Sequence, residues 1–227
     1  MRGSICRRMK RNEQKEIESR LLSQKNILSY ILRETIKEFA NMDLTDIVPL
    51  IDDNIFISQK SAELGDYLSV GFYVHMNSGY SQVLINIEAE ESKKQIEQDF
   101  LTQGIVQLCN LVALQNENNL IMSQFKNMLN TYCICIYFNI GQDFMNYFTI
   151  TNQSLIGDYN WLYKHDLLNL ILVGVDKTFQ ADIKKAAETD SGLHNALRIM
   201  FCNTLSFKEK VEQLEKSIHI PANEQKV

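Results

Sequence analysis

Two uninterrupted apolar runs constrain most strongly what this chain can fold into. Residues 132–140 (YCICIYFNI) and 167–175 (LLNLILVGV) hold no charged side chain and are rich in aliphatic and aromatic residues. Both are much shorter than the ~20 apolar residues that span a bilayer. Short continuous apolar runs are typical of strands buried on both faces. The two runs therefore predict a sheet whose central strands are covered on both sides.

A β-hairpin is predicted upstream of these runs. Residues 67–76 and 82–90 alternate apolar and polar side chains, and Asn77-Ser78-Gly79 between them is turn chemistry. One face of the first strand carries Leu68, Val70, Phe72, Val74 and Met76. The other face carries Tyr67, Ser69, Gly71, Tyr73 and His75. We expect the first of these faces to lie in the core.

Helical periodicity marks most of the remaining chain. It predicts helices at 12–40, with a break at 23–26, and at 91–118, 181–200 and 207–218. A helical turn is expected at 44–50, and strands at 54–58 and 147–151. In the helix at 91–118 the apolar positions are Ile96, Phe100, Ile105, Leu108, Leu111 and Val112. Gly104 in the same helix indicates close packing on the sheet.

The order of these elements predicts an α/β fold. A mixed central β-sheet should be flanked by helices, with helical segments at both ends of the chain. The length of 227 residues suits one core of moderate size. We divide the chain into a basic arm and helix start at 1–25, a core at 26–187 and a C-terminal helical segment at 188–227.

Charge is unevenly distributed along the chain. Residues 1–25 contain eight Lys or Arg and three Asp or Glu, whereas the whole chain has a formal net charge of −5. An acidic body is a poor general binder of nucleic acid, because phosphate neutralisation supplies most non-specific affinity. Positive charge for DNA or partner contact is offered by Arg7, Arg8, Lys10 and Arg11. A frayed, solvated terminus explains the same residues.

The location expected from composition is cytoplasmic. The N-terminal residues lack the apolar segment of a secretory signal, and no apolar run reaches membrane length. Five Cys without paired spacing suit reduced thiols. Cys133 and Cys135 fall in an apolar strand and are expected to be core thiols. The four His residues have no ligand-like spacing and are expected at the surface or at caps.

The most specific local motif is residues 85–90 (INIEAE). Glu88 and Glu90 are two residues apart and so share one strand face. Oxygen ligands that converge in this way suit Mg²⁺, which is a hard cation. The alternative is a solvated strand end that runs into the acidic first turn of a helix.

Several segments in order resemble one known family. They are LLSQKNILSYILRETIKEFANMDLTDI, LINIEAE, LTQGIVQLCNLVALQ, TYCICIYFNI, SLIGDYNWLYKHDLLNLILVGV and FKEKVEQLEKSIHI. Together, from about residue 21 to 220, the chain resembles the PD-(D/E)XK nuclease family transposases, also called recombination-promoting nucleases. The resemblance implies a restriction-endonuclease-like fold and Mg²⁺-dependent DNA cleavage. It also implies a catalytic site formed by an acid on the first hairpin strand with Glu88 and Glu90.

The chain departs from the family pattern at the implied catalytic site. Ser69 stands where the metal-binding Asp is expected, and Gln103 replaces an Arg of the following helix. Glu90 replaces a Gln. Asp66 is the nearest other acid, but without a β-bulge it falls on the opposite strand face from Ser69. The remaining metal ligands would be Glu88, Glu90 and, weakly, Asp66.

Three functional hypotheses follow. The first is a degenerate, non-cleaving nuclease-like protein of a mobile element or phage, which binds a protein partner such as a host defence component and needs no cofactor. The alternative is an active Mg²⁺-dependent DNA endonuclease that serves transposition or recombination. The third is a homodimeric scaffold that pairs through its C-terminal helices.

Overall fold

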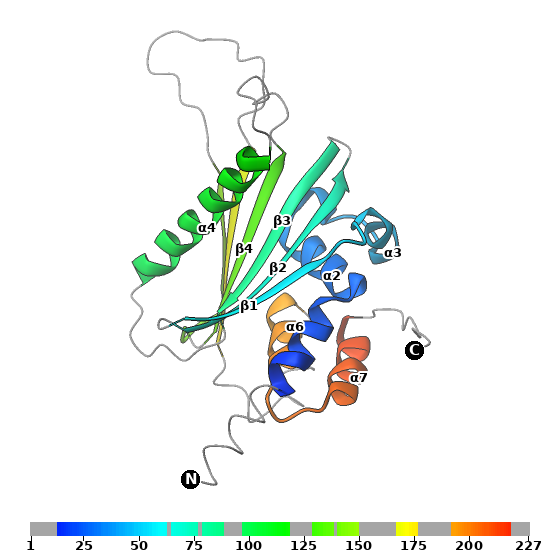
Figure 1. The fold of residues 1–227 in the computed structure, drawn as a ribbon. Coiled ribbons are helices and arrows are strands. Elements are labelled where there is room, and N and C mark those ends of the chain that lie inside the picture. The colour runs from blue at the N-terminus through cyan, green and yellow to red at the C-terminus, as the bar shows by residue number, and fades with distance from the viewer. Residues whose placement is uncertain are drawn as a thin grey trace. The chain divides into compact units, whose positions relative to one another are not determined.

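Among the residues that the structure describes, six strands form one mixed sheet in this computed structural model (Figure 1). The described residues are 13–62, 65–76, 79–88, 97–118, 129–138, 140–149, 167–176 and 192–218. The strands are β1 (Phe56–Ala62), β2 (Gly65–Met76), β3 (Gly79–Glu88), β4 (Asn130–Phe138), β5 (Phe144–Thr149) and β6 (Leu168–Val175). Their order in the sheet is β1-β2-β3-β4-β6-β5. Because β3 and β4 are parallel while β1–β2, β2–β3 and β5–β6 are antiparallel, the predicted mixed α/β sheet is confirmed.

The described residues fall into two compact units. One combines parts of Met1–Ile51, Asn139–Asp143 and Val175–Val227, and the other combines parts of Asp52–Phe138 and Phe144–Gly174. The second unit holds the sheet, and the first is helical. The first unit joins segments from both ends of the chain.

The hairpin forms as its alternation predicts. The ladder runs without interruption from Tyr67↔Glu88 to Met76↔Gly79. Every described residue on the predicted core face of β2 is buried, whereas its other face is half-buried or exposed. Gly79 follows the turn with φ of 111°, a conformation that glycine adopts without steric cost. The register is therefore fixed by the apolar face together with the turn.

Both apolar runs are buried strands, as predicted. Both observed bounds of β4 lie two residues before the expected ones, and β6 starts one residue after its expected start. A polar residue, Asn169, is buried at the start of β6. Its Nδ2 donates to Asn130 Oδ1 at 2.8 Å, and its Oδ1 accepts a hydrogen bond from the Tyr147 hydroxyl. These bonds satisfy the buried amide and join β4, β6 and β5 side by side.

Helix α4 (Glu97–Asn118) packs on the sheet through its buried residues Phe100, Gly104, Leu108 and Leu111. A Cβ at Gly104 would lie 2.9 Å from Leu170 Cδ1, so close packing explains this glycine as predicted. Ile105, one of the apolar positions of the predicted helix, is 47% exposed. Successive helical residues are rotated by about 100°, and the inward position of Gly104 turns Ile105 away from the sheet.

The first unit contains the helical segment 13–22, α2 (Lys25–Thr35), α3 (Leu44–Ile47), α6 (Leu193–Met200) and α7 (Phe207–Ile218). Short 3₁₀ turns, η1 (Lys37–Phe39) and η2 (Val48–Leu50), follow α2 and α3. The predicted break at 23–26 is present, because Gln24 is extended and occupies the N-cap position of α2. The helix predicted to continue to residue 40 ends at Thr35, since Ile36 is extended. The predicted start of the helix at 181–200 lies outside the described residues.

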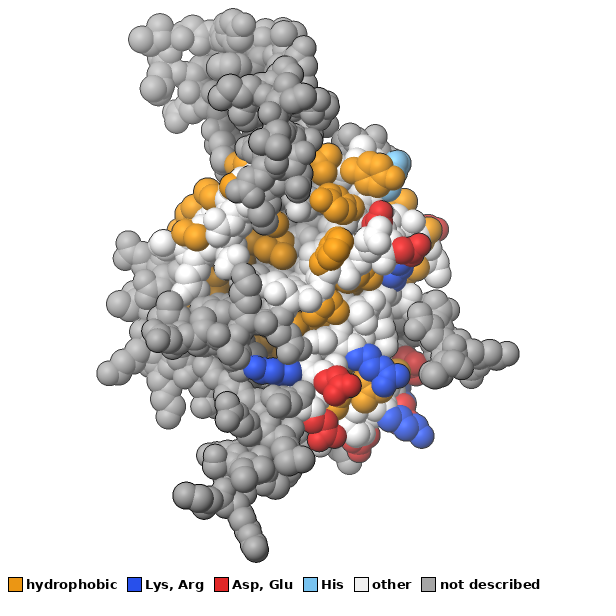
Figure 2. All heavy atoms as spheres, viewed as in Figure 1, with side chains coloured by type: hydrophobic (Ala, Val, Ile, Leu, Met, Phe, Trp, Pro, Cys, Tyr) orange, Lys and Arg blue, Asp and Glu red, His pale blue; other side chains and the backbone are white. Residues whose placement is uncertain are grey.

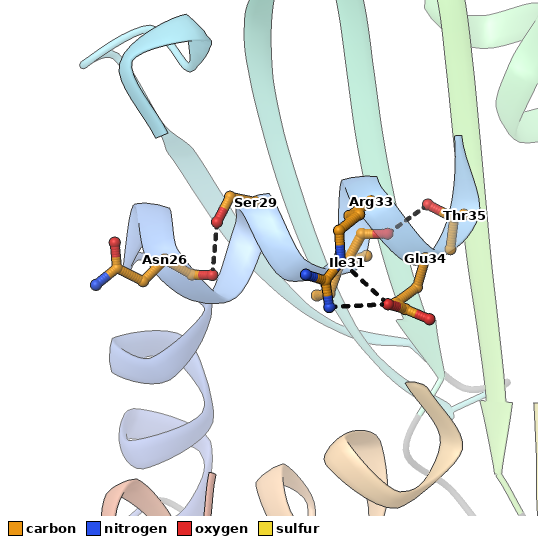
Figure 3. Close-up of polar contacts among 6 residues, drawn as sticks. All are labelled: Asn26, Ser29, Ile31, Arg33, Glu34 and Thr35. Atoms are coloured by element: carbon orange, nitrogen blue, oxygen red, sulfur yellow. Dashed lines mark hydrogen bonds and ion pairs between the residues drawn. The ribbon is translucent and has the colours of Figure 1, made fainter. Parts of the chain in front are cut away.

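Polar side chains on α2 are satisfied locally (Figure 3). The buried Ser29 hydroxyl donates to the Asn26 carbonyl at 2.8 Å, and the Thr35 hydroxyl donates to the Ile31 carbonyl at 2.6 Å. Arg33 pairs with the adjacent Glu34 at 3.1 Å, and both side chains are half-buried. The two hydroxyl bonds satisfy Ser29 and Thr35 within the helix itself.

A buried lysine connects α6 and α7. Lys210 Nζ donates to the Met200 carbonyl at 2.7 Å, which satisfies a carbonyl at the end of α6. Burial lowers the pKa of the Lys210 amine below its ordinary value of 10.5, and the charge of Glu18 acts in the opposite direction. Arg20 lies 4.2 Å above the Phe207 ring. These contacts join the segment 13–22, α6 and α7 in one helical unit.

Candidate functional site

The central feature of the site is a neutral hydrogen-bonded pair on adjacent strands. Ser69 and Asn86 are partners in the β2–β3 ladder, and the Ser69 hydroxyl donates to Asn86 Oδ1 at 2.7 Å. Asn86 is buried and Ser69 is half-buried. Neither side chain carries charge, at the position where the resemblance implies an aspartate. Asn86 was not among the predicted site residues, although strand parity places it on the face of Ser69 and Glu88.

Asp66 is not brought to this pair by the backbone. The β1–β2 ladder pairs Ser61↔Asp66 and Ser58↔Ser69 in one continuous register, and the described β2 contains no bulge. Asp66 therefore occupies a position on the face of Leu68, opposite to the face of Ser69. The bulge that would have allowed Asp66 to replace the missing acid is absent from β2.

Glu88 is the last residue of β3. Its Cα pairs with Tyr67 on one side and with Tyr137 of β4 on the other. The parity of β3 places the Glu88 position on the same face as Asn86, two residues away. The structure therefore brings the Glu88 position next to the Ser69–Asn86 pair. Glu90, Arg7, Arg8, Lys10 and Arg11 lie outside the described residues.

Gln103 lies at the same end of the sheet as Glu88. The Tyr137 hydroxyl donates to the Phe100 carbonyl at 3.1 Å, and the two rings lie 4.4 Å apart. Since Tyr137 is the ladder partner of Glu88, this bond places the first turns of α4 over the end of β3 and β4. Gln103 follows Phe100 by about one helical turn and is half-buried.

Over β1, β2 and β3, the only charged residues that the described ladder places on this sheet face are Lys60 and Glu88, which lie in one row with Tyr67. The open face is defined by Phe56, Ser58, Ser69, Gly71, Tyr73, His75, Tyr80, Gln82, Leu84 and Asn86. Among these described residues there is no Asp, Glu, Lys or Arg. Phe56 is 66% exposed and Tyr80 is 56% exposed, with the Tyr80 ring edge-on to His75. Figure 2 shows hydrophobic side chains gathered over β2, β3 and α4.

Cys133 and Cys135 continue the same sheet face into β4 and are buried, as predicted. Their sulfur atoms lie 3.7 Å apart. The hydrogen bond with Cys135, followed by burial, raises the pKa of the Cys133 thiol well above its ordinary value of 9.0. A thiol with a raised pKa stays protonated at neutral pH and is a poor nucleophile or metal ligand. The pair therefore serves as packing.

Within the described part of the chain, no three His, Cys, Asp or Glu side chains are grouped closely enough to hold a metal ion. None of the described helices has the length and apolar character needed to cross a membrane. Comparison of the chain with protein-family models, with curated proteins and with solved structures found no match.

Proposed function

We propose that this protein is a non-cleaving, nuclease-like protein that acts by binding a protein partner through the open face. The observation that carries the proposal is the 2.7 Å hydrogen bond between Ser69 and Asn86, set in a face without charge among its described side chains. The restriction-endonuclease-like fold and an origin on a mobile element or phage belong to the same proposal.

The chemistry of Mg²⁺ argues against cleavage. The ion is held by anionic oxygen ligands and gives up its waters reluctantly. A serine hydroxyl whose hydrogen is committed to Asn86 supplies no negative charge, and the Asp66 position lies on the other strand face. Metal-assisted phosphodiester hydrolysis needs the ion to activate water and stabilise the developing charge. With one carboxylate position lost, Glu88 and Glu90 hold the ion too weakly for this step.

The surface chemistry favours a protein over a nucleic acid at the open face. Phosphate binding depends on Lys and Arg, and the described ladder places only one such residue, Lys60, on this sheet face, at the strand end near Glu88. Exposed aromatic side chains such as Phe56 and Tyr80 are the residue types that anchor protein interfaces. A partner with an apolar patch is the occupant that these side chains suit. DNA contact through Arg7, Arg8, Lys10 and Arg11 stays a separate prediction for the N-terminal arm.

One observation favours the alternative of a Mg²⁺-dependent DNA endonuclease. The Glu88 position shares a face with Ser69 and Asn86, and the first turns of α4 with Gln103 lie over the same strand end. A single well-placed carboxylate assisted by Glu90 would then have to hold the ion. The proposal of a binding protein is preferred because it does not need a metal-binding carboxylate at residue 69, which the open face lacks.

Photo-crosslinking in cells tests the proposed binding surface. A photoreactive phenylalanine analogue is placed at Phe56, and at Lys208 on the exposed side of α7 as a control position. The proposal predicts an adduct between the Phe56 position and a protein other than this chain, with lower yield when Tyr80→Glu is added. An adduct with nucleic acid at Phe56, or equal protein adducts at both positions, would contradict it.

A further inference from the structure

The outward side of α4 carries an uncharged stripe. Between Phe100 and Asn116 the sequence contains no Asp, Glu, Lys or Arg. The α4 stripe, defined by exposed residues at helical spacing, consists of Thr102, Ile105, Val106, Cys109 and Ala113. Ile105 and Val106 are 47% and 51% exposed. The residues at 102, 106, 109 and 113 follow the alternating four-and-three spacing of a helix-pairing seam.

Comparison with α7 shows that an uncharged exposed helix surface is unusual in this chain. The exposed positions of α7 include Lys208, Glu209, Glu212 and Lys216, which is the pattern of a helix whose outer face meets water. The α4 stripe has the composition of a contact surface instead. This contrast also argues against the predicted pairing through the C-terminal helices, because the exposed side of α7 is charged.

We propose that the α4 stripe is the interface between two copies of this chain. A twofold interface is isologous, so each residue meets itself or its symmetry mate, and a charge near the axis meets the same charge. The chain has a formal net charge of −5, so two copies repel wherever acidic surface meets acidic surface. An uncharged stripe avoids this repulsion. It offers a charged foreign partner no charge of the opposite sign to bind.

The size of α4 sets the expected strength of the dimer. A helix of 22 residues is about 33 Å long, and paired helices pack about 8–10 Å apart. One such helix pair lies at the small end of specific interfaces, which bury about 1,200–2,000 Å² in total. The dimer is therefore expected to dissociate on dilution. Both a parallel and an antiparallel pairing centred on the stripe bring Cys109 close to its symmetry mate.

Two measurements test the dimer. Light scattering over a range of concentrations should give a mass that rises from 26.3 kDa toward twice that value. Val106→Glu should remain monomeric at every concentration. Met145→Glu is the matched control, since Met145 is 47% exposed and its strand parity places it on the sheet face away from α4. A wild type that is monomeric at the highest concentration, or a Val106→Glu variant that still dimerises, would overturn the proposal.

Disulfide trapping gives a readout that does not depend on the folding of the Val106 variant. In a Cys6→Ser background, diamide should link two Cys109 side chains. Each thiol gives up one proton and one electron, the sulfur–sulfur bond forms, and diamide is reduced to its hydrazine. We expect a band of doubled mass that Cys109→Ser abolishes. The other described thiols are buried, so a dimer band that survives Cys109→Ser, or the absence of any band, would contradict the interface.

Discussion

The hydroxyl of Ser69 donates a 2.7 Å hydrogen bond to the side-chain oxygen of Asn86 across the β2–β3 ladder. This bond joins two neutral side chains at the position where the family resemblance implies a metal-binding acid. A buried amide oxygen that accepts such a bond is satisfied. The pair is therefore stable without a metal ion, and restoring metal affinity requires negative charge to be added at this position.

Adding a carboxylate at residue 69 should raise the affinity for divalent cations. We expect Ser69→Asp to bind Mn²⁺ at least about tenfold more tightly than wild type, because an anionic oxygen replaces a neutral one. Calorimetric titration with Mn²⁺ measures the change. Ser58→Asp is the control, since Ser58 is the β1 ladder partner of Ser69 and gains the same charge one strand away. Equal gains in Mn²⁺ affinity in both variants would show that position 69 is not part of a specific metal site.

Two buried asparagines should respond in opposite directions to the same substitution. Neither amide atom of the buried Asn195 has a hydrogen-bond partner among the described residues, whereas Asn169 is bonded to Asn130 and Tyr147. An unsatisfied buried polar group costs about 1–3 kcal/mol. Asn195→Leu should therefore raise the free energy of unfolding in urea, and Asn169→Leu should lower it. A loss of stability in Asn195→Leu would mean that this amide has a partner.

Gly104→Ala should destabilise the protein although alanine is the better helix former. The helical preference for Ala is about 1 kcal/mol, but overpacking costs about 1–3 kcal/mol. The new Cβ would lie 2.9 Å from Leu170 and 3.0 Å from Leu172, both buried. We expect a net loss of about 1 kcal/mol in urea unfolding. In a Leu170→Ala background the same change should become neutral or favourable, and an identical loss in both backgrounds would refute the packing explanation.

The buried amine of Lys210 should give a pH-dependent contribution to stability. Its pKa is below 10.5 in the folded state because of burial, so the unfolded chain binds more protons in the window just below pH 10.5. Stability from this group therefore rises with pH through that window. The free energy of unfolding of wild type minus that of Lys210→Met should increase toward pH 10.5.

Lys208→Met is the control for Lys210→Met, because it removes an exposed amine from the same helix. Comparison with a variant also cancels the ionisation of tyrosines, which both proteins share. A difference between wild type and Lys210→Met that is constant or falls from pH 8 to 10.5 would contradict the assigned burial effect.

Local patterns predicted much of the sheet. Alternation between Tyr67 and Met76 gave the hairpin and its buried face, and the continuous run at 167–175 gave β6. Periodicity alone did not show which apolar residues of α4 face the sheet, and Ile105, beside the inward Gly104, points outward. Periodicity failed at the end of α2, where Ile36 is extended although its side chain is apolar and buried.

The site was harder to predict than the sheet, because it depends on register. The pairing of Ser69 with Asn86 follows from the ladder, and a shift of one residue would have placed another side chain opposite Ser69. Parity within one strand predicts that Glu88 shares a face with Glu90, but it cannot relate Glu88 on β3 to Ser69 on β2. Whether Asp66 could replace the missing acid depended on a bulge, and single-sequence patterns do not reveal an absent bulge.

Plasmid nicking tests the central claim most directly. Wild type, Glu88→Ala and Ser69→Asp are incubated with supercoiled DNA in Mg²⁺ and in Mn²⁺, after circular dichroism has shown that all three are folded. The proposed binding protein predicts that wild type nicks no faster than Glu88→Ala in either metal. Robust Mg²⁺-dependent cutting by wild type that Glu88→Ala abolishes would contradict it and establish the endonuclease.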